Sequence, residues 1–208
     1  MTKDYSQYCP VCHALEAVGE RWSLVIVRDL LQGPKRYTDL LEGLPGIGTN
    51  ILASRLRDLE AAGVVRKTKL PPPAASTVYE LTEYGSELEE VIYALGRWGA
   101  RSLGPPRPTD HLAGGWLKSA VRATFDPTAA RGVETTYLVK CGDEEATLRI
   151  ADGTLEIVEG PALADVAVEI SSPAELFQLV SGELAPEDEE LARFASFFSF
   201  ARRGAVSV

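Results

Sequence analysis

The chain has 208 residues, of which 45% are hydrophobic and 25% charged, and its formal net charge is −9 at pH 7. This length allows one large or two small domains, and the composition excludes wholesale disorder. The longest aliphatic run, residues 24–27, is far too short to span a bilayer, and the N-terminal residues lack the apolar segment of a secretory signal. Because the three cysteines also argue against a disulfide scaffold, we expect a cytoplasmic protein without a membrane partner.

The negative charge is unevenly distributed along the chain. Residues 1–104 carry 12 Lys and Arg against 13 Asp and Glu, a net charge of −1, whereas residues 105–208 carry 9 against 17, a net charge of −8. Residues 35–69 carry 7 basic against 4 acidic side chains, a net charge of +3. The overall acidity therefore does not exclude nucleic acid as a partner of the first half.

The first half of the chain is predicted to be mostly helical. Short helices are expected over residues 11–18, 21–32 and 37–42, and glycines end the first two. The turn Leu44-Pro45-Gly46 precedes a fourth helix, which is expected over residues 49–62. Two helices that meet across a tight Gly/Pro turn are typical of a helix-turn-helix.

Helix 49–62 is predicted to be amphipathic. One stripe is expected to carry its large apolar side chains: Ile51, Leu52, Leu56 and Leu59. The opposite face is expected to carry polar side chains of the kinds that read base edges in a DNA major groove: Asn50, Ser54, Arg55 and Arg57. Two alternatives remain open, because Thr49 or Asn50 can cap the helix and Arg55 can form an ion pair with Asp58 or Glu60.

A hairpin and a long helix are predicted to follow. Strands are expected over residues 64–70 and 77–81, and a hairpin behind a helix-turn-helix is a winged-helix arrangement. Basic side chains near helix 49–62 are candidates for phosphate contact, although singly they are ordinary solvated charges: Lys35, Arg36, Arg66, Lys67 and Lys69. Residues 82–103 are predicted to form one long helix whose apolar side is a candidate dimer seam.

The first half resembles the HxlR family of bacterial winged-helix regulators, which are relatives of the MarR type. The resemblance covers residues 8–103 and rests on ordered strings: Cys9-Pro10-Val11, Gly19-Glu20-Arg21-Trp22, Leu30-Leu31-Gln32-Gly33-Pro34, Leu52-Ala53-Ser54-Arg55-Leu56 and Tyr79-Glu80-Leu81-Thr82. It implies a homodimer that binds a two-fold-related operator in double-stranded DNA through paired recognition helices. This chain has Gly48-Thr49 where family members often carry serine followed by a bulky residue or proline.

The second half is predicted to be a separate α+β domain. Prolines and a glycine within residues 103–110 indicate a linker, so we assign a winged helix-turn-helix DNA-binding and dimerisation domain to residues 1–104, a linker to 105–110 and the second domain to 111–208. A helix is expected over residues 116–123, and another opens at Ser172-Pro173. Four strands, residues 133–140, 146–150, 154–159 and 166–170, are predicted to form an antiparallel sheet. An acidic helix is expected over residues 187–203.

This half resembles a sterol-carrier-protein-type domain. The strings that carry the resemblance are Leu148-Arg149-Ile150-Ala151-Asp152-Gly153, Asp165-Val166-Ala167-Val168-Glu169-Ile170 and Leu176-Phe177-Gln178-Leu179-Val180. The resemblance implies a lipophilic cavity between sheet and helices, and hence an apolar small-molecule effector. Aromatic side chains are candidates to line it, although a plain hydrophobic core would use the same residues: Trp116, Phe177, Phe194, Phe197 and Phe198.

Cys9 and Cys12 form a C-x-x-C motif next to His13. A structural zinc site needs four ligands, so we expect neither a metal nor another cofactor. Some members of the family sense oxidants through a cysteine at the position of Cys9, and Cys12 could resolve it; small buried structural residues are the alternative. We find no Ser/His/Asp set, Gly-rich phosphate loop or pair of catalytic carboxylates, so catalytic residues are not expected and the chain is not predicted to be an enzyme.

Three functions are consistent with these patterns. The preferred one is a homodimeric DNA-binding transcriptional regulator, modulated by a lipophilic ligand or by thiol oxidation. The alternative is a lipid-binding or small-molecule-binding carrier module that uses the winged helix as a dimerisation scaffold. A third is a redox dithiol protein that uses Cys9 and Cys12.

Overall fold

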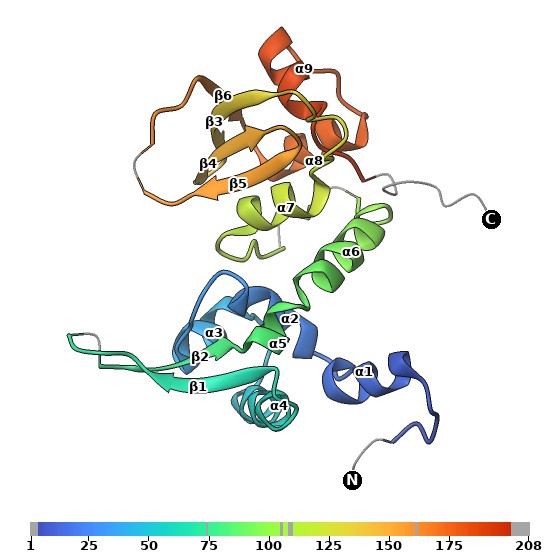
Figure 1. Cartoon of the computed structure of the whole chain (residues 1–208), viewed down its shortest axis with the longest axis vertical. Coiled ribbons are helices and arrows are strands. Elements are labelled where there is room, and N and C mark those ends of the chain that lie inside the picture. Colours follow the sequence, from blue (N-terminus) through green and yellow to red (C-terminus); the bar gives the residue numbers. More distant parts are fainter. Residues whose placement is uncertain (1–3, 74, 105, 108–109, 161, 201–208) are drawn as a thin grey trace. The chain divides into compact units, whose positions relative to one another are not determined.

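The computed structural model describes residues 4–73, 75–104, 106–107, 110–160 and 162–200. The chain forms two compact units, Met1–Ile92 and Tyr93–Val208, here called the N-terminal and C-terminal units (Figure 1). The predicted domains 1–104 and 111–208 stay predictions, as does the linker, of which residues 105, 108 and 109 lie outside the described residues. Within the described residues, no helix has the length and apolar character needed to cross a membrane.

Four helices open the N-terminal unit, as predicted. They are α1 (Pro10–Val18), α2 (Ser23–Leu30), α3 (Tyr37–Gly43) and α4 (Thr49–Ala61). The predicted start of α2 is two residues too early, because Trp22 has a φ of +81°, which a helix cannot contain. The predicted end at residue 32 is also too late, since α2 ends at Leu30.

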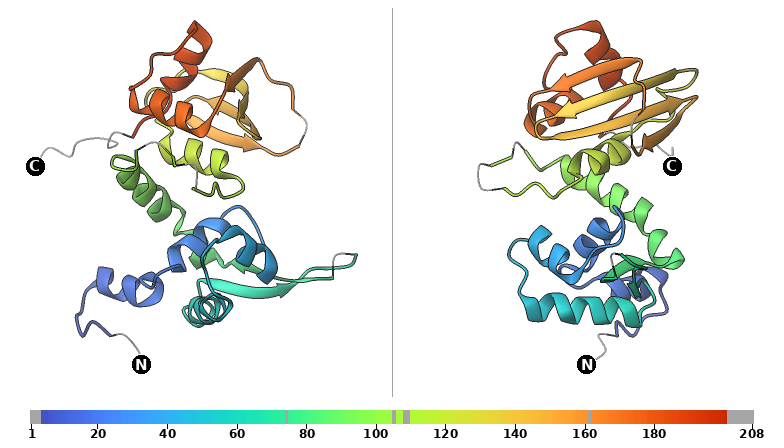
Figure 2. Two further views of the ribbon diagram at one scale, coloured as in Figure 1. Left: turned by 180° about the vertical axis from the view of Figure 1, so that it is seen from behind. Right: turned by 90° about the vertical axis from the view of Figure 1, so that its left-hand side faces the viewer.

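A β-hairpin completes the winged helix. Strands β1 (Val65–Lys69) and β2 (Thr77–Leu81) pair antiparallel, with Val65 opposite Leu81 and Lys69 opposite Thr77. In the left view of Figure 2 the hairpin extends away from the helices of its unit. The core beneath it contains the fully buried leucines of α4: Leu52, Leu56 and Leu59. Ile51 was predicted to share their stripe, but that prediction is wrong because its side chain is 44% exposed.

The predicted single helix over residues 82–103 is two helices. They are α5 (Glu83–Ser86) and α6 (Glu89–Ala100). The Thr82 hydroxyl accepts the Gly85 backbone N–H at 2.9 Å, and the backbone N–H of Leu88 donates to the Gly85 carbonyl at 3.2 Å, a tight turn rather than a continued α-helix. Leu88, just before α6, and Ile92, within α6, pack against the core of the N-terminal unit.

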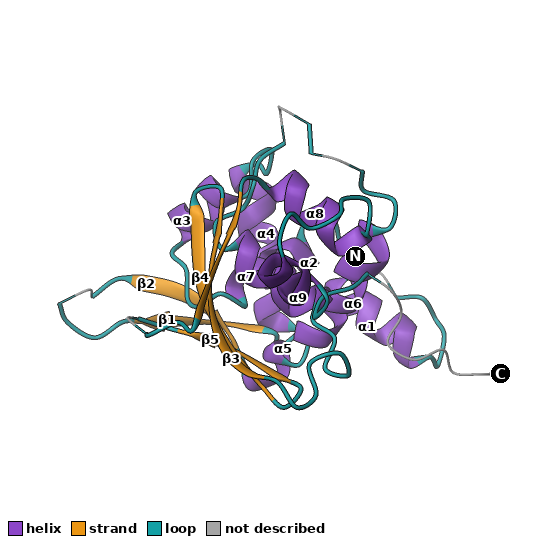
Figure 3. Cartoon of the chain, turned by 90° about the horizontal axis from the view of Figure 1, so that it is seen from above, coloured by secondary structure: helices purple, strands orange, loops and turns teal. Residues whose placement is uncertain are grey.

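The C-terminal unit contains a four-stranded sheet. It is built from helix α7 (Trp116–Thr124), strands β3 (Glu134–Cys141), β4 (Glu144–Ala151), β5 (Thr154–Val158) and β6 (Val166–Ile170), and helices α8 (Pro173–Ser181) and α9 (Glu189–Ala195). The strand order is β5-β4-β3-β6. Its core lies on one face, where Tyr137, Val139 and Leu148 are fully buried. Figure 3 shows α7, α8 and α9 on that single side of the sheet.

The prediction of a purely antiparallel sheet is wrong for β6. Strands β3, β4 and β5 form the predicted meander, but β6 pairs parallel to β3 at the opposite edge from β5. Parallel neighbours need a connection of about a dozen residues or more, and β4 and β5 supply it. The start of β6 is held by Asp165, whose carboxylate accepts the Thr136 N–H and whose own N–H donates to the Thr136 carbonyl, both at 2.8 Å.

Helix α9 is shorter than the predicted helix over residues 187–203. The Asp188 carboxylate caps its start by accepting the Leu191 N–H at 2.7 Å. It ends at Ala195, because the Phe197 carbonyl accepts the Asp126 N–H and the Ser199 N–H donates to the Thr124 carbonyl, each at 2.7 Å. Residues 201–203 of the prediction lie outside the described residues.

Candidate nucleic-acid interface

Helix α4 presents one polar face that is not used by the core. Its N-cap is Gly48, which has extended backbone angles, so neither Thr49 nor Asn50 caps the helix. At about 100° per residue, Ser54 and Arg57 lie within about 40° of Asn50 around the helix axis. Thr49, Asn50 and Arg57 are exposed, and Ser54 is half-buried. The first turn is tied to α3, because the Tyr37 hydroxyl donates to the Thr49 carbonyl at 2.7 Å.

Arg55 does not lie on this face, so the prediction that it shares the face with Asn50 is wrong. Five residues of helix place it about 140° away, at the edge of the buried leucine stripe. Its side chain is 17% exposed and forms ion pairs with Glu20 and Asp58. Arg57 is the arginine that points outward, and its Nε donates to the Ala53 carbonyl of the same helix at 3.3 Å. Arg57 was predicted on this face, and its seven-residue spacing from Asn50 agrees with its exposed position.

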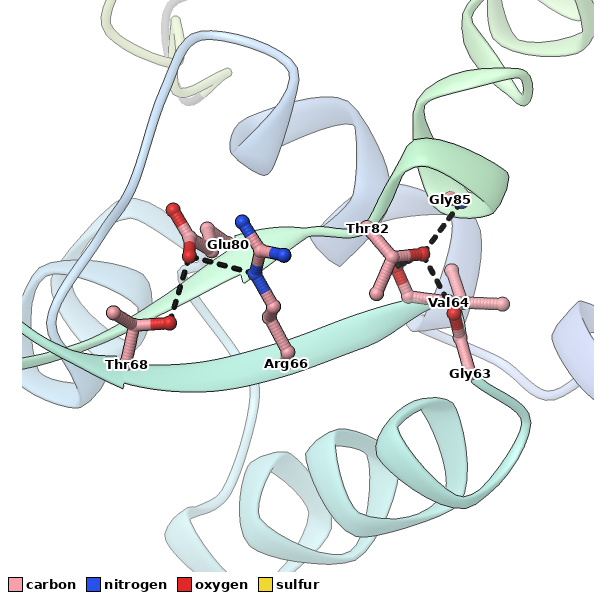
Figure 4. A network of polar contacts seen from close by, with 7 residues as sticks. All are labelled: Gly63, Val64, Arg66, Thr68, Glu80, Thr82 and Gly85. Atoms are coloured by element: carbon pink, nitrogen blue, oxygen red, sulfur yellow. Dashed lines mark hydrogen bonds and ion pairs between the residues drawn. The ribbon is translucent and has the colours of Figure 1, made fainter.

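Polar contacts fix the base and the middle of the hairpin (Figure 4). The Glu80 carboxylate accepts hydrogen bonds from the Thr68 hydroxyl at 2.7 Å and from Arg66 Nε at 2.8 Å. The hydrogen bond from Thr68, together with Arg66, lowers the pKa of Glu80 below its ordinary value. At the base, the Thr82 hydroxyl donates to the Gly63 carbonyl at 2.6 Å. Arg66, a predicted phosphate contact, is therefore committed to an ion pair within the wing.

A row of basic side chains crosses the wing on either side of Tyr79. Lys67 is opposite Tyr79 in the strand register, and its ammonium lies 5.8 Å from the tyrosine ring centroid. On the other side, the Lys35 backbone pairs with that of Tyr79 through hydrogen bonds of 3.0 and 2.8 Å. Lys69 is exposed two residues further along β1. The structure thus brings Lys35 and Lys67 together, although they are distant in sequence.

Five cations of this region have no acidic partner among the described residues: Lys35, Arg36, Arg57, Lys67 and Lys69. Side chains that are not held in internal ion pairs are the ones available to neutralise backbone phosphates. Together with the polar face of α4, they form a surface with the groups needed for both base readout and phosphate contact.

Comparisons with known proteins place this region in a family. A family model described as HxlR-like helix-turn-helix matches residues 17–106. The HTH-type transcriptional regulator YodB of Bacillus subtilis (strain 168) is 34% identical to the chain over 98 residues, which cover 47% of the chain and 88% of YodB. The chain belongs to the HxlR family of helix-turn-helix transcriptional regulators.

Further relatives of this HxlR-family chain are known. The uncharacterized HTH-type transcriptional regulator sll1512 of Synechocystis is 34% identical over 92 residues, which cover 44% of the chain and 68% of sll1512. A structure of the reduced form of YodB from B. subtilis covers 49% of the chain and 100% of its own length, at 32% identity and a TM-score of 0.41. The family model ends at residue 106, and the sterol-carrier resemblance of the second half stays a prediction.

The C-x-x-C motif lies at the start of α1 in this HxlR-family chain. Cys9 is the N-cap residue, and the backbone N–H groups of Cys12 and Val11 at the start of the helix lower the pKa of its thiol. The Cys12 thiol donates to Gln7 Oε1 at 3.7 Å, and burial, followed by its interaction with Cys9, raises the pKa of Cys12. Both thiols are half-buried and free. Within the described residues, no group of three or more His, Cys, Asp and Glu side chains forms a candidate metal site.

Four of the five predicted ligand-binding aromatics lie in or against the core of the C-terminal unit, and the fifth, Phe177, is half-buried. Phe194, Phe197 and Phe198 are buried, and the ring centroids of Phe194 and Phe198 are 4.8 Å apart. Trp116 packs against this core, and Phe177 lies with its ring centroid 5.2 Å from that of Phe200. A cavity of about 400 Å³ between β6, α8 and α9 is lined by other side chains, many of them acidic: Glu169, Glu175, Glu187, Asp188 and Glu190. An apolar pocket lined by these aromatics stays a prediction.

Proposed function

We propose that this HxlR-family regulator binds double-stranded DNA as a cytoplasmic homodimer, with α4 in the major groove and the β1–β2 hairpin against the DNA backbone. The observation that carries the proposal is that the exposed polar face of α4 occurs together with cations on both sides of Tyr79 that have no acidic partner among the described residues. The proposed base readers are Asn50, Ser54 and Arg57, and Thr49 contacts the edge of the groove. The proposed phosphate contacts are Lys35, Arg36, Lys67 and Lys69.

A homodimer is favoured by an apolar stripe on α6. Val91, Leu95 and Trp98 follow one another at intervals of four and three residues and therefore share one side of the helix. Leu95 is 47% exposed and Trp98 is 70% exposed. Large side chains recurring in this way on an exposed helix are unfavourable in water and are stabilised by a partner helix. We propose that two copies of the chain pair along this stripe and thereby set the spacing of two α4 helices.

A titration of DNA binding across salt concentrations tests the proposal. The probe is a duplex selected by the wild-type protein from a random-sequence pool. Changing Lys35→Ala and Lys67→Ala together should reduce the slope of log affinity against log salt by about 1.8, since each lost phosphate contact contributes about 0.9. The matched control removes Lys118 and Lys140, two lysines of the C-terminal unit. Absence of salt-dependent binding, or equal slopes for the two double variants, would refute the proposed interface.

We further propose that oxidation of Cys9 modulates DNA binding. A lowered thiol pKa increases the fraction of Cys9 thiolate, the form that attacks a peroxide. The attack breaks the O–O bond, leaves a sulfenic acid on Cys9 and releases water after protonation; the Cys12 thiol then displaces a second water to form the disulfide. The position of Cys12 in the first turn of α1, three residues after Cys9, supports this second step.

Two cysteine variants separate the steps of this mechanism. Cys9→Ser should abolish any effect of peroxide on DNA binding. Cys12→Ser should keep the initial reaction but prevent the intramolecular disulfide, which mass spectrometry detects as a loss of two hydrogens. An unchanged peroxide response in Cys9→Ser would eliminate thiol modulation at this site and leave the DNA-binding proposal intact.

A second candidate function, binding of an apolar small molecule, rests on Tyr137. Its ring is fully buried against Phe194, yet its hydroxyl has no hydrogen-bond partner among the described residues. A buried hydroxyl without a partner costs about 1–3 kcal/mol, and a ligand that carries one hydrogen-bonding group in an apolar body would supply that partner. Native mass spectrometry of the purified protein tests for such a ligand. Tyr137→Phe should weaken retention of the ligand by the protein. If no ligand is bound and Tyr137→Phe makes the protein more stable, Tyr137 belongs to a plain hydrophobic core.

A further inference from the structure

Arg55 is held between two carboxylates rather than presented to solvent. Its Nη2 lies 3.2 Å from Glu20 Oε2, and its Nη1 contacts the Asp58 carboxylate one turn along α4. The Nε atom is buried and has no hydrogen-bond partner among the described residues. A guanidinium in this position cannot reach a groove that faces Asn50 on the far side of the helix. Its contacts are directed toward the protein itself.

The partner Glu20 lies outside α4, in the turn between α1 and α2. That turn is held against the core of the N-terminal unit, because Trp22, which has a left-handed backbone, packs against that core. The Arg21 guanidinium covers the same ring at 5.3 Å from its centroid. The Glu20–Arg55 ion pair therefore connects α4 to a turn that lies outside the helix and packs on the same core.

The two attachments of α4 restrict different motions. The leucine stripe, Leu52, Leu56 and Leu59, fixes how closely the helix packs but allows small rotations about its axis, because side-chain contacts of this kind are non-directional. A charge-assisted hydrogen bond at the edge of the stripe is directional and resists such rotation. We infer that Glu20 and Arg55 are a positioning pair that sets the rotation of α4, and so the direction in which Asn50, Ser54 and Arg57 point.

This inference rests on the proposed DNA binding. It predicts that removing the charge of Glu20 weakens binding to the selected DNA sequence, whereas electrostatics alone predicts stronger binding. Replacing Glu20 by glutamine removes a negative charge close to a polyanion, which on charge alone should strengthen binding to any DNA. If Glu20 positions α4, the same change should instead weaken binding to the selected sequence. Binding to random sequence depends on phosphate contacts rather than on base readout, so it should not weaken.

The experiment compares Glu20→Gln with Glu42→Gln, using the duplex selected by the wild-type protein and a scrambled duplex of equal length. Glu42 is exposed on α3, whereas Arg55 is paired with Glu20 and Asp58, so the change at Glu42 controls for the lost charge. Glu20→Gln should lower affinity for the selected duplex about tenfold, as expected for a lost charge-assisted contact, and leave the scrambled duplex unaffected. Asp58→Asn should act in the same direction. A thermal melt confirms that each variant is folded.

Arg55→Gln tests the same role through a second measurement, the slope of log affinity against log salt, which changes only if Arg55 contacts a phosphate. As a positioning residue, Arg55 should leave the salt slope unaltered while the affinity for the selected duplex falls. A slope reduced by about 0.9 would identify Arg55 as a phosphate contact and overturn the inference. Equal behaviour of Glu20→Gln and Glu42→Gln, or equal losses on both duplexes, would also overturn it. If the wild-type protein binds neither duplex, the proposed DNA binding itself fails. If the wild-type protein binds and only the variant results differ from those expected, the positioning role of Glu20 and Arg55 fails alone.

Discussion

The backbone of Gly85 in α5 lies so close to the Val64 carbonyl that a Cβ atom at position 85 would overlap its oxygen. The contact is between two backbone segments, so no flexible side chain can move aside. It places α5 directly against the base of the wing, where the Thr82 N–H also donates to the Val64 carbonyl at 3.1 Å.

We therefore expect Gly85→Ala to destabilise the N-terminal unit by about 1–3 kcal/mol, the usual cost of forcing extra atoms into a packed site. Gly96→Ala is the matched control, because Gly96 lies in α6 with no atom near the added Cβ. It should stabilise the protein by up to about 1 kcal/mol through its higher helix propensity. Urea unfolding measures both changes, and a neutral Gly85→Ala would contradict the close approach.

Glu144 caps a helix from a neighbouring strand. Its two carboxylate oxygens accept the Gly115 N–H at 2.6 Å and the Leu117 N–H at 2.9 Å, at the start of α7. Glu144→Ala should cost about 1–3 kcal/mol, because two helix-terminal N–H groups lose a charged acceptor. Glu145→Ala, which removes an exposed ion pair with Lys140, should change stability by less than about 1 kcal/mol. Equal effects of the two variants would show that Glu144 does not hold α7.

The three cysteines should react with iodoacetamide at different rates. The lowered pKa of Cys9 gives it the larger thiolate fraction at neutral pH, whereas the raised pKa of Cys12 keeps that thiol protonated. Cys141 is fully buried. We expect alkylation first at Cys9, then at Cys12, and at Cys141 only after unfolding, as peptide mass spectrometry over time would show. Faster alkylation of Cys12 than of Cys9 would contradict the lowered pKa of Cys9 and the raised pKa of Cys12.

Alkaline pH should destabilise the C-terminal unit through Cys141. Burial raises the pKa of this thiol from 9.0 to about 12. Between these values the unfolded chain releases the proton while the folded chain keeps it, so the unfolded state binds fewer protons and stability falls as pH rises. The stabilising contribution is complete below pH 9 and decreases by at most about 1.4 kcal/mol per pH unit. Cys141→Val should reduce this slope in urea unfolding between pH 9 and 11, with Tyr137, whose pKa burial also raises, accounting for a remainder.

Local sequence patterns predicted most helices and strands. The elements that differ between prediction and structure depend on pairing with residues distant in the sequence. The periodicity of helix 49–62 and the Ser172 cap of α8 are local, and both match the structure, since Ser172 accepts the Glu175 N–H at 3.2 Å. The direction of β6 depends on its pairing with β3, where Tyr137 lies opposite Val166, and an alternating pattern carries no information about that direction. The premature end of α9 likewise depends on backbone pairing with the segment after α7.

The candidate site was predicted unevenly for the same reason. Its residue types were visible in sequence, and the spacing of Asn50, Ser54 and Arg57 identified the exposed face. The commitment of Arg55 to Glu20, 35 positions away, depends on tertiary packing that periodicity does not encode. The same holds for Lys35, which reaches the wing through a single bridge to Tyr79.

Pairing of two copies along α6 should be sensitive to charge in the apolar stripe. Trp98→Glu places a carboxylate at the most exposed large side chain of the stripe, and burying it without a partner would cost several kcal/mol. We expect this variant to be monomeric in sedimentation-velocity measurements at concentrations where the wild type is dimeric. Because a two-fold operator needs both recognition helices, its affinity for the selected duplex should fall with the dimer. Leu163→Glu, at a 97% exposed position between β5 and β6, is the matched control and should leave the dimer intact. A dimeric Trp98→Glu would place the interface elsewhere.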